Sequence, residues 1–180
     1  HAKNFVYDSI KKLNLNQNSR VLEIASNDGY LLENFVKEKI PCIGIEPTND
    51  CAEVSISKGI DTRKSFFNLK FAEKLKKEVT FDLVIANNVL AHVPDLNDFI
   101  SGISKVLKKN GSVSIEFPHL LQLIKFNQFD TIYHEHYSYF SLKVVQKIAL
   151  EFDLMVYDVD ELSTHGGSLR VWLTKSSSIK

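Results

Sequence analysis

The sequence has little cysteine, no surplus of either charge and no long apolar run. Its two cysteines, Cys42 and Cys51, form no CxxC pair and cannot supply a four-thiolate zinc site. We interpret them as two reduced thiols, with a disulfide between them as the lesser alternative. Basic and acidic residues balance at 22 each, so the charge favours neither a nucleic-acid partner nor an anionic membrane surface. No apolar segment approaches the ~18 residues of a membrane span, and residues after His1 lack the apolar core of a signal peptide. We therefore expect a cytoplasmic protein.

What remains is ordinary globular composition, with 44% hydrophobic and 24% charged residues in a chain of 180. That length suits one domain with a sizeable core. We expect residues 1–180 to form a single domain, and, since the chain starts at His1, to be a fragment of a longer protein.

Short apolar runs alternate with segments of helical periodicity along most of the chain. We predict strands at residues 21–25, 42–46, within 59–67, and at 81–87, 112–117, 154–159 and 168–174. We predict helices at residues 5–13, 30–39, 49–58, 68–78, 95–107 and 141–152, with Asp95 and Ser141 as N-caps. Residues 118–140 have no clear period, and the tail from Lys175 reads as loose. Alternation of this kind predicts an α/β fold, a mostly parallel sheet with helices on both faces. The last two strands read as a hairpin, so at least one is antiparallel.

Polar clusters follow the predicted strands at the points where they end. They occupy residues 25–29, 46–47, 65–67, 87–92 and 116–119. In open α/β sheets, ligands bind outside the carboxyl ends of the strands. The sequence therefore predicts a binding cleft at this edge of the sheet.

Two of these clusters indicate a ribose-containing cofactor. The first strand runs into the turn ASNDG (residues 25–29), which is poorer in glycine than the G-x-G-x-x-G fingerprint. Glu46 ends the second strand 23 positions after Glu23, where an acid suits hydrogen bonds to ribose hydroxyls. A nicotinamide dinucleotide and S-adenosylmethionine both carry such a ribose. The missing glycines disfavour the dinucleotide, because a pyrophosphate needs close backbone approach.

The segment YHEHYSY (residues 133–139) places two histidines on either side of a glutamate. It can be a metal site, a catalytic acid–base cluster or an aromatic segment that only packs. In an extended segment, residues two apart point the same way, so Tyr133 and Glu135 would share one face and His134 and His136 the other. These side chains converge only if the segment bends.

Several long stretches resemble the catalytic core of the sugar C-methyltransferases. They are ASNDGYLL, GIEPTNDCAEVSISKGIDTRKSFF, FDLVIANNVLAHVPDLNDF, FDTIYHEHYSYFS and THGGSLRVW. The resemblance extends from about residue 20 to the C-terminus. It implies a Rossmann-like S-adenosylmethionine methyltransferase fold, and methylation of a carbon next to the keto group of a nucleotide-linked deoxysugar. Complete members of the family add a cysteine-rich zinc-binding N-terminal part and a second Rossmann-like C-terminal part, which are not in this sequence.

The resemblance also assigns a cofactor site along the strand ends. The first turn would hold the methionine moiety, Glu46 the ribose, the double phenylalanine the adenine, and the asparagine pair the sulfonium region. The residues so assigned are Ala25, Ser26, Asn27, Asp28, Glu46, Pro47, Ser65, Phe66, Phe67, Asn87 and Asn88.

Methyl transfer to carbon requires a nucleophile made by deprotonation next to a ketone, and therefore a base and a group that stabilises the enolate oxygen. The resemblance makes His136 the base, with Glu135 and Tyr133 around the sugar and His92 near the keto oxygen. A catalytic metal is not expected, because methyl activation needs no Lewis acid. Two other functions stay open at this point: a nicotinamide-dependent oxidoreductase and a non-catalytic binding domain.

Overall fold

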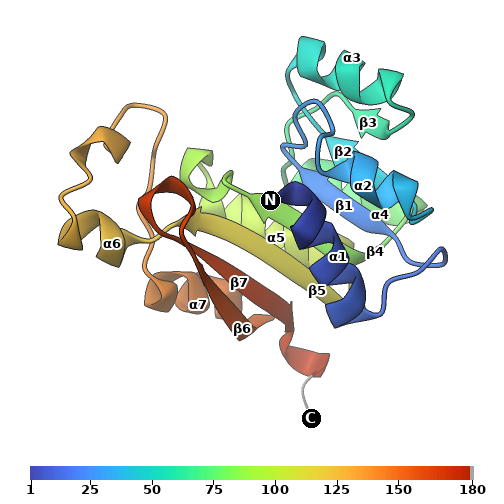
Figure 1. Ribbon diagram of the computed structural model, residues 1–180. Coiled ribbons are helices and arrows are strands. Elements are labelled where there is room, and N and C mark those ends of the chain that lie inside the picture. Colours follow the sequence, from blue (N-terminus) through green and yellow to red (C-terminus); the bar gives the residue numbers. More distant parts are fainter. Residues whose placement is uncertain (179–180) are drawn as a thin grey trace.

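The computed structural model describes residues 1–178 and contains one seven-stranded sheet with the order β3-β2-β1-β4-β5-β7-β6. The strands β1 to β5 are parallel to one another, whereas β7 is antiparallel to both β5 and β6 (Figure 1). The bounds are β1 Val21–Ile24, β2 Cys42–Ile45, β3 Asp61–Arg63, β4 Phe81–Asn87, β5 Leu107–Pro118, β6 Leu154–Leu162 and β7 Ser168–Lys175. The predicted parallel sheet with an antiparallel C-terminal hairpin is confirmed.

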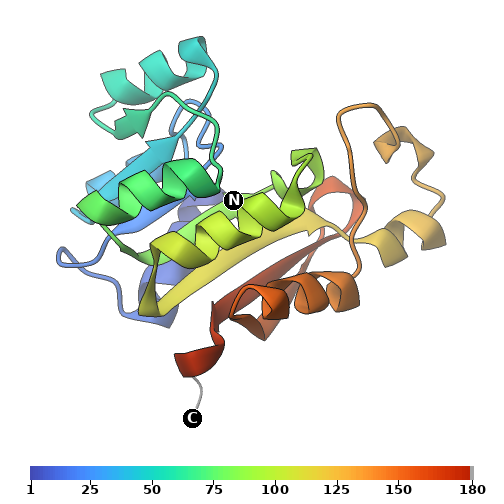
Figure 2. The same ribbon diagram turned by 180° about the vertical axis from the view of Figure 1, so that it is seen from behind.

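Helices cover both faces of the sheet, as the alternating pattern predicts. The bounds are α1 Ala2–Leu13, α2 Leu32–Lys37, α3 Asn49–Ser57, α4 Leu69–Glu78, α5 Leu96–Val106, α6 Leu120–Lys125 and α7 Leu142–Glu151. One apolar cluster joins α1 and α2 to the sheet and includes Phe5, Leu32, Phe35 and Trp172. The other joins α4, α5 and α7 to the opposite face and includes Leu75, Phe99 and Val145; these three helices lie in front in Figure 2.

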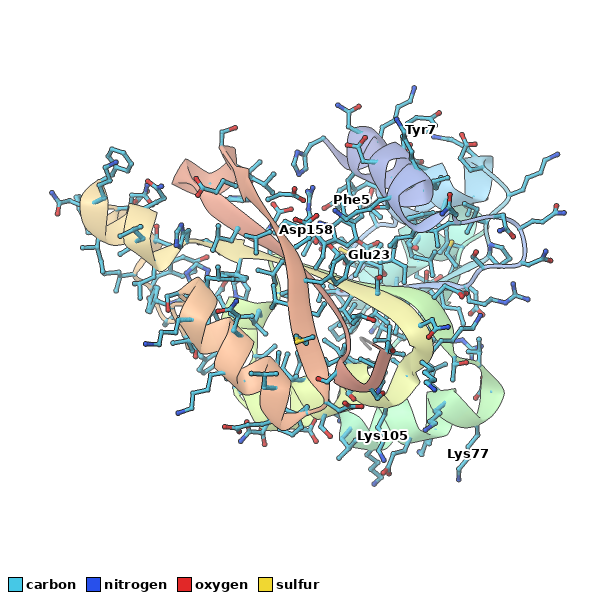
Figure 3. The ribbon with its side chains drawn as sticks, turned by 90° about the horizontal axis from the view of Figure 1, so that it is seen from below. Phe5, Tyr7, Glu23, Lys77, Lys105 and Asp158 are labelled. Atoms are coloured by element: carbon cyan, nitrogen blue, oxygen red, sulfur yellow. The ribbon has the colours of Figure 1, made fainter. Side chains whose placement is uncertain are left out.

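The side-chain layers follow from this arrangement. In Figure 3, Phe5 and Glu23 lie between α1 and the sheet, while Lys77 and Lys105 stand at the outer surface of the other helical layer. The ring of Phe5 stacks on Trp172 of β7 with centroids 6.1 Å apart. Helix α1 is thereby fixed over the antiparallel end of the sheet, and its N-terminus is close to the strand ends that carry the polar clusters.

Two predicted helix starts are confirmed by their cap geometry. The side chain of Asp95 accepts from Asp98 N at 3.0 Å, and that of Ser141 accepts from Val144 N at 3.4 Å. Each cap satisfies one backbone donor that the first helical turn leaves free.

The structure differs from the sequence prediction in several places. Strand β5 starts at Leu107 rather than at residue 112, because residues 108–111 continue extended from the end of α5 instead of forming a turn. Helix α2 is shorter than predicted. Residues 118–140 are not wholly irregular, since they contain α6 and a 3₁₀ turn at Phe129–Thr131. In the tail, Lys175 ends β7 and Ser176–Ser178 form a 3₁₀ turn; residues 179–180 lie outside the described residues.

Residues 119–140 project from the body of the protein, and we call them the arm (Figures 1 and 2). A bridge between His119 and Phe140 closes its base, with Leu120 N donating to Phe140 O at 3.0 Å. None of residues 119–139 is buried. Hydrogen bonds, rather than a core of its own, therefore hold the arm against the body.

Candidate active site

The turn after β1 is built from left-handed residues. The φ angles of Ala25, Asn27 and Gly29 are 58°, 50° and 76°. A Cβ at Gly29 would lie 2.4 Å from Ile60 Cδ1, so this turn can pack against Ile60 only because residue 29 is a glycine. Ala25 carries a side chain in a conformation that favours glycine, which indicates that the turn is shaped for backbone access rather than for low strain.

Glu46 joins the first two strand-end loops. Its carboxylate accepts from Asn27 N at 3.0 Å and from Thr48 N at 2.8 Å, and the residue is 4% exposed. An ionised carboxylate offers about four acceptor positions. Two therefore remain for hydroxyl groups of a ligand.

A cavity of about 410 Å³ opens beside this turn, within the size range of small-ligand sites. Its lining is mostly apolar. It includes Ala25, Pro47, Ser65, Phe66, Phe67, His92 and Tyr137, together with Ile24, Ile45, Val89, Val93, Pro94 and Phe99. Phe66 is 76% exposed, whereas Phe67 packs edge-on against Phe99 at 5.7 Å between ring centroids. Phe66 thus offers a free aromatic face at the cavity, and Phe67 is largely part of the core.

The arm bends at Tyr133 and brings its side chains together. His136 N donates to Tyr133 O at 3.1 Å, which closes a turn. The two rings lie 4.3 Å apart, and the Tyr133 hydroxyl is 3.2 Å from His136 Nε2. His136 Nδ1 is 2.8 Å from Thr131 O. A carbonyl oxygen only accepts, so Nδ1 carries the proton, and neutral His136 presents its lone pair at Nε2.

His92 reaches the same place from the body. It ends the 3₁₀ turn Leu90–His92 that follows β4, and its ring is 4.7 Å from that of His136. His92 Nδ1 is 3.1 Å from Glu135 O, so this nitrogen also donates to a carbonyl. The Glu135 side chain is 62% exposed and 3.9 Å from His134 Nε2. Glu135 therefore reaches His92 through its backbone.

A second cavity of about 300 Å³ is lined in part by this cluster. Its lining includes Asn88, His92, Asp130, Tyr133, His136 and His165. His92 lines both cavities. His92 is thus the one predicted catalytic residue that both linings share, whereas Tyr133 and His136 line only the second cavity.

A family model described as a methyltransferase domain matches residues 1–159. The chain belongs to this methyltransferase family.

Solved structures agree with the family assignment. The magnesium protoporphyrin IX methyltransferase of Synechocystis PCC 6803 with bound SAH (S-adenosylhomocysteine) aligns with 97% of this chain and 81% of its own. Its TM-score is 0.74 and its sequence identity 14%, so the likeness concerns the fold. The predicted Rossmann-like methyltransferase fold and S-adenosylmethionine as cofactor are confirmed. The nicotinamide alternative is thereby set aside.

The relatives of this methyltransferase include a C-methyltransferase and an O-methyltransferase. C-methyltransferase NovU of Streptomyces niveus is 32% identical over 179 residues, which are 99% of this chain and 43% of NovU. The mitochondrial ubiquinone biosynthesis O-methyltransferase of Bos taurus is 31% identical over 110 residues, 58% of this chain and 30% of that protein. The chain thus spans less than half the length of either relative.

Glu23 is a buried acid of the methyltransferase that was not among the site residues predicted from the sequence. Glu23 of β1 is 3% exposed, and its Oε2 has no hydrogen-bond partner among the described residues. Burial raises the pKa of Glu23 well above its usual range, and the nearby Asp28 and Glu46 add to the effect. By contrast, a hydrogen bond from Lys58 at 2.8 Å lowers the pKa of Asp28. The signal in the sequence is a glutamate inside the otherwise apolar run VLEIA.

Not every predicted cofactor residue of the methyltransferase presents its side chain to the first cavity. Ser26 is fully buried, and a Cβ on Gly44 would lie 2.5 Å from its Oγ, so this hydroxyl points at β2. Asn88 lines the second cavity, in a left-handed conformation with φ 53°. The buried Oδ1 of Asn87 has no partner among the described residues.

Two absences concern only residues 1–178. No helix of that part is long and apolar enough to cross a membrane. No three His, Cys, Asp or Glu side chains in the same range are grouped in a way that could hold a metal ion.

Proposed function

We propose that this methyltransferase methylates the carbon next to the keto group of a nucleotide-activated deoxysugar, through a base-generated enolate. The observation that carries the proposal is the pair His92 and His136: their ring centroids are 4.7 Å apart, both line the second cavity, and His92 also lines the first. The similarity to C-methyltransferase NovU along 99% of the chain supports it. We also infer that the chain is the catalytic core of a longer protein, because it spans 43% of NovU.

The first cavity fits the cofactor. Its apolar walls and the exposed ring of Phe66 suit a purine, and the free acceptor positions of Glu46 suit ribose hydroxyls. Glu23 Oε2 and Asn87 Oδ1 do not line this cavity, but both oxygens are buried without a partner among the described residues, which is costly unless a ligand donor reaches them. When bound, S-adenosylmethionine supplies an electrophilic methyl group.

The residues of the arm and of β4 would supply the nucleophile. His136 Nε2 accepts the proton from the carbon next to the ketone, which leaves an enolate. The Thr131 carbonyl holds the ring and its tautomer for that role. Tyr133, at 3.2 Å from the same nitrogen, can donate to an oxygen of the substrate once the nitrogen is protonated.

His92 would stabilise the enolate oxygen, and the structure sets a condition for this role. Its Nδ1 proton is committed to Glu135 O. His92 can therefore donate to the substrate only from Nε2, and only when both ring nitrogens carry protons. In this scheme Glu135 positions His92 through its carbonyl, in addition to the predicted side-chain contact with the sugar.

Solvent exchange tests the enolate separately from methyl transfer. The protein, loaded with S-adenosylhomocysteine, is incubated in D₂O with a nucleotide-linked 4-keto-deoxysugar. Proton NMR should show loss of the signal of the hydrogen next to the ketone. In His136→Asn the exchange and the turnover should both fall by at least ~10²-fold, while calorimetric S-adenosylmethionine binding stays unchanged.

His134→Asn is the matched control, because His134 is on the same arm but its side chain is 90% exposed. Full exchange in His136→Asn would remove His136 as the base. Methyl transfer to an oxygen, with no exchange at carbon, would refute the proposed reaction. Where the 180-residue chain gives no turnover, the same measurements are made on the longer parent protein.

A further inference from the structure

The turn between β6 and β7 contains a histidine that the proposed chemistry does not use. His165, Gly166 and Gly167 all have positive φ angles, of 51°, 74° and 118°. His165 is exposed and lines the second cavity. Its ring makes no hydrogen bond within the described part of the chain, so both nitrogens are available to a ligand.

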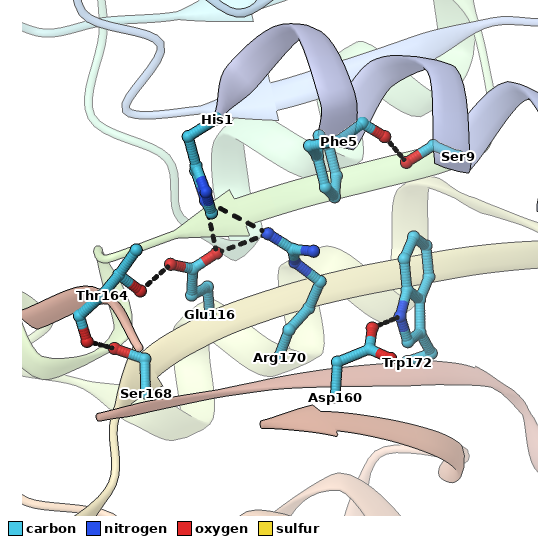
Figure 4. A network of polar contacts seen from close by, with 9 residues as sticks. All are labelled: His1, Phe5, Ser9, Glu116, Asp160, Thr164, Ser168, Arg170 and Trp172. Atoms are coloured by element: carbon cyan, nitrogen blue, oxygen red, sulfur yellow. Dashed lines mark hydrogen bonds and ion pairs between the residues drawn. The ribbon is translucent and has the colours of Figure 1, made fainter. Parts of the chain in front are cut away.

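A buried ion pair fastens this turn to the sheet (Figure 4). Arg170 Nη2 donates to Glu116 Oε2 at 2.9 Å, and the two side chains are 9% and 2% exposed. Thr164 Oγ1 donates to the other carboxylate oxygen of Glu116 at 3.2 Å, while Ser168 Oγ donates to Thr164 O at 3.0 Å. The residue before His165 is therefore fixed to β5.

The arm holds the other side of the turn. Gln128 Nε2 donates to Gly166 O at 2.7 Å, and His119 N donates to Gly167 O at 3.0 Å. A Cβ on Gly166 would lie 2.6 Å from Gln128 Nε2, and one on Gly167 would lie 2.8 Å from Gln122 Cγ. The two glycines thus allow close contact, and His165 is held between the sheet and the arm in a conformation that few side chains adopt.

The second cavity has no permanently charged donor. No lysine or arginine is among the residues that line it. Two of its three histidines, His92 and His136, have one ring nitrogen committed to a backbone carbonyl and the other directed to the proposed proton transfers. His165 is the remaining imidazole, and it is open to solvent.

We propose that His165 binds the diphosphate of the acceptor substrate and that the Glu116–Thr164 contact positions it. The proposal rests on the proposed function, since it takes the acceptor to be a nucleotide-linked sugar. Hydrogen bonds between an imidazole and phosphate oxygens are charge-assisted. Binding of this kind contributes to the ground state and to the transition state alike, so it should appear in KM and not in kcat.

Steady-state kinetics on the holoenzyme test this. In His165→Ala the KM for the keto-sugar nucleotide should rise by about 10-fold or more, with kcat within ~3-fold and the Kd for S-adenosylmethionine unchanged. His134→Ala should leave all three as in wild type. Thr164→Val should raise KM in the same direction but less, with kcat kept. An unchanged KM, or a loss confined to kcat, in His165→Ala would overturn the proposal.

A binding measurement without turnover separates this proposal from the proposed function. The protein saturated with S-adenosylhomocysteine is titrated with thymidine diphosphate and, in parallel, with uridine diphosphate by calorimetry. Binding that weakens by about 10-fold in His165→Ala supports the diphosphate contact even if no keto sugar is methylated. Equal binding in the two proteins, or none to wild type, overturns it even if keto sugars are methylated.

Discussion

Replacing Arg170 by methionine should destabilise the protein strongly, because it leaves the buried Glu116 without its arginine partner and with only Thr164 and, at 3.8 Å, His1 nearby. The pair is joined at 2.9 Å, with side chains 9% and 2% exposed. Removing one member of a buried pair typically costs ~3–5 kcal/mol. Methionine keeps most of the apolar stem, but the guanidinium that lies 4.6 Å over the Phe5 ring is lost as well, which adds about 0.5–2 kcal/mol. We expect Arg170→Met to lower the free energy of unfolding by ~3.5–7 kcal/mol.

The measurement is urea unfolding followed by circular dichroism, with thermal unfolding beside it. At ~2–4 °C per kcal/mol for a chain of this size, Tm should fall by ~7–28 °C. The double variant Glu116→Gln/Arg170→Met removes the orphaned charge and keeps an acceptor for Thr164, so it should recover most of the loss. A loss under ~1 kcal/mol in Arg170→Met, or a double variant no more stable than the single one, would show that Glu116 and Arg170 do not form a buried ion pair that stabilises the fold.

Three further variants test the cofactor side. Glu46→Gln replaces one of the two carboxylate acceptors by an amide donor facing a backbone N–H; its calorimetric Kd for S-adenosylmethionine should rise by ~10–100-fold, and an unchanged Kd would contradict the ribose assignment. Glu23→Gln should stabilise the cofactor-free protein at pH 7 but not near pH 4. Burial raises the pKa of Glu23 in the folded state, so its contribution to stability is present below the unfolded value of ~4.3 and is lost as pH rises toward the raised folded pKa. Urea unfolding at both pH values checks this, and an equal effect at both would count against it. Ala25→Gly removes a Cβ from a left-handed residue and should raise Tm by ~2–4 °C, about 1 kcal/mol; a lower Tm would show that Ala25 is not strained.

The sequence predicted the parts of the fold that depend on local patterns. Strand positions came from short apolar runs, and the caps Asp95 and Ser141 came from residue type just before a periodic segment. The cleft followed from a topological rule, because parallel strands bring their carboxyl ends to one edge. Ala25, Pro47 and Phe66 accordingly line one cavity although they lie up to 41 positions apart, whereas the predicted Glu46 and Asn87 do not line it.

What could not be predicted depends on tertiary contacts. The arm bends where Tyr133 and His136 close a turn. It is also held to the body by a hydrogen bond in which Tyr137 N donates to Ala91 O at 2.8 Å. Neither contact has a local signal, since a run such as YHEHYSY fits an extended segment equally well. The same holds for Glu135, whose backbone and not its side chain reaches His92.

His92 and His136 cannot have the same proton state during the proposed reaction. Each has Nδ1 committed to a carbonyl, so each faces the substrate with Nε2. Removing a proton from carbon requires an Nε2 lone pair, and stabilising the enolate oxygen requires an Nε2 proton. In the state that the proposed reaction needs, each histidine carries a proton on Nδ1, and His92 alone carries a further proton on Nε2. Losing that proton leaves no donor, and gaining a second leaves no base.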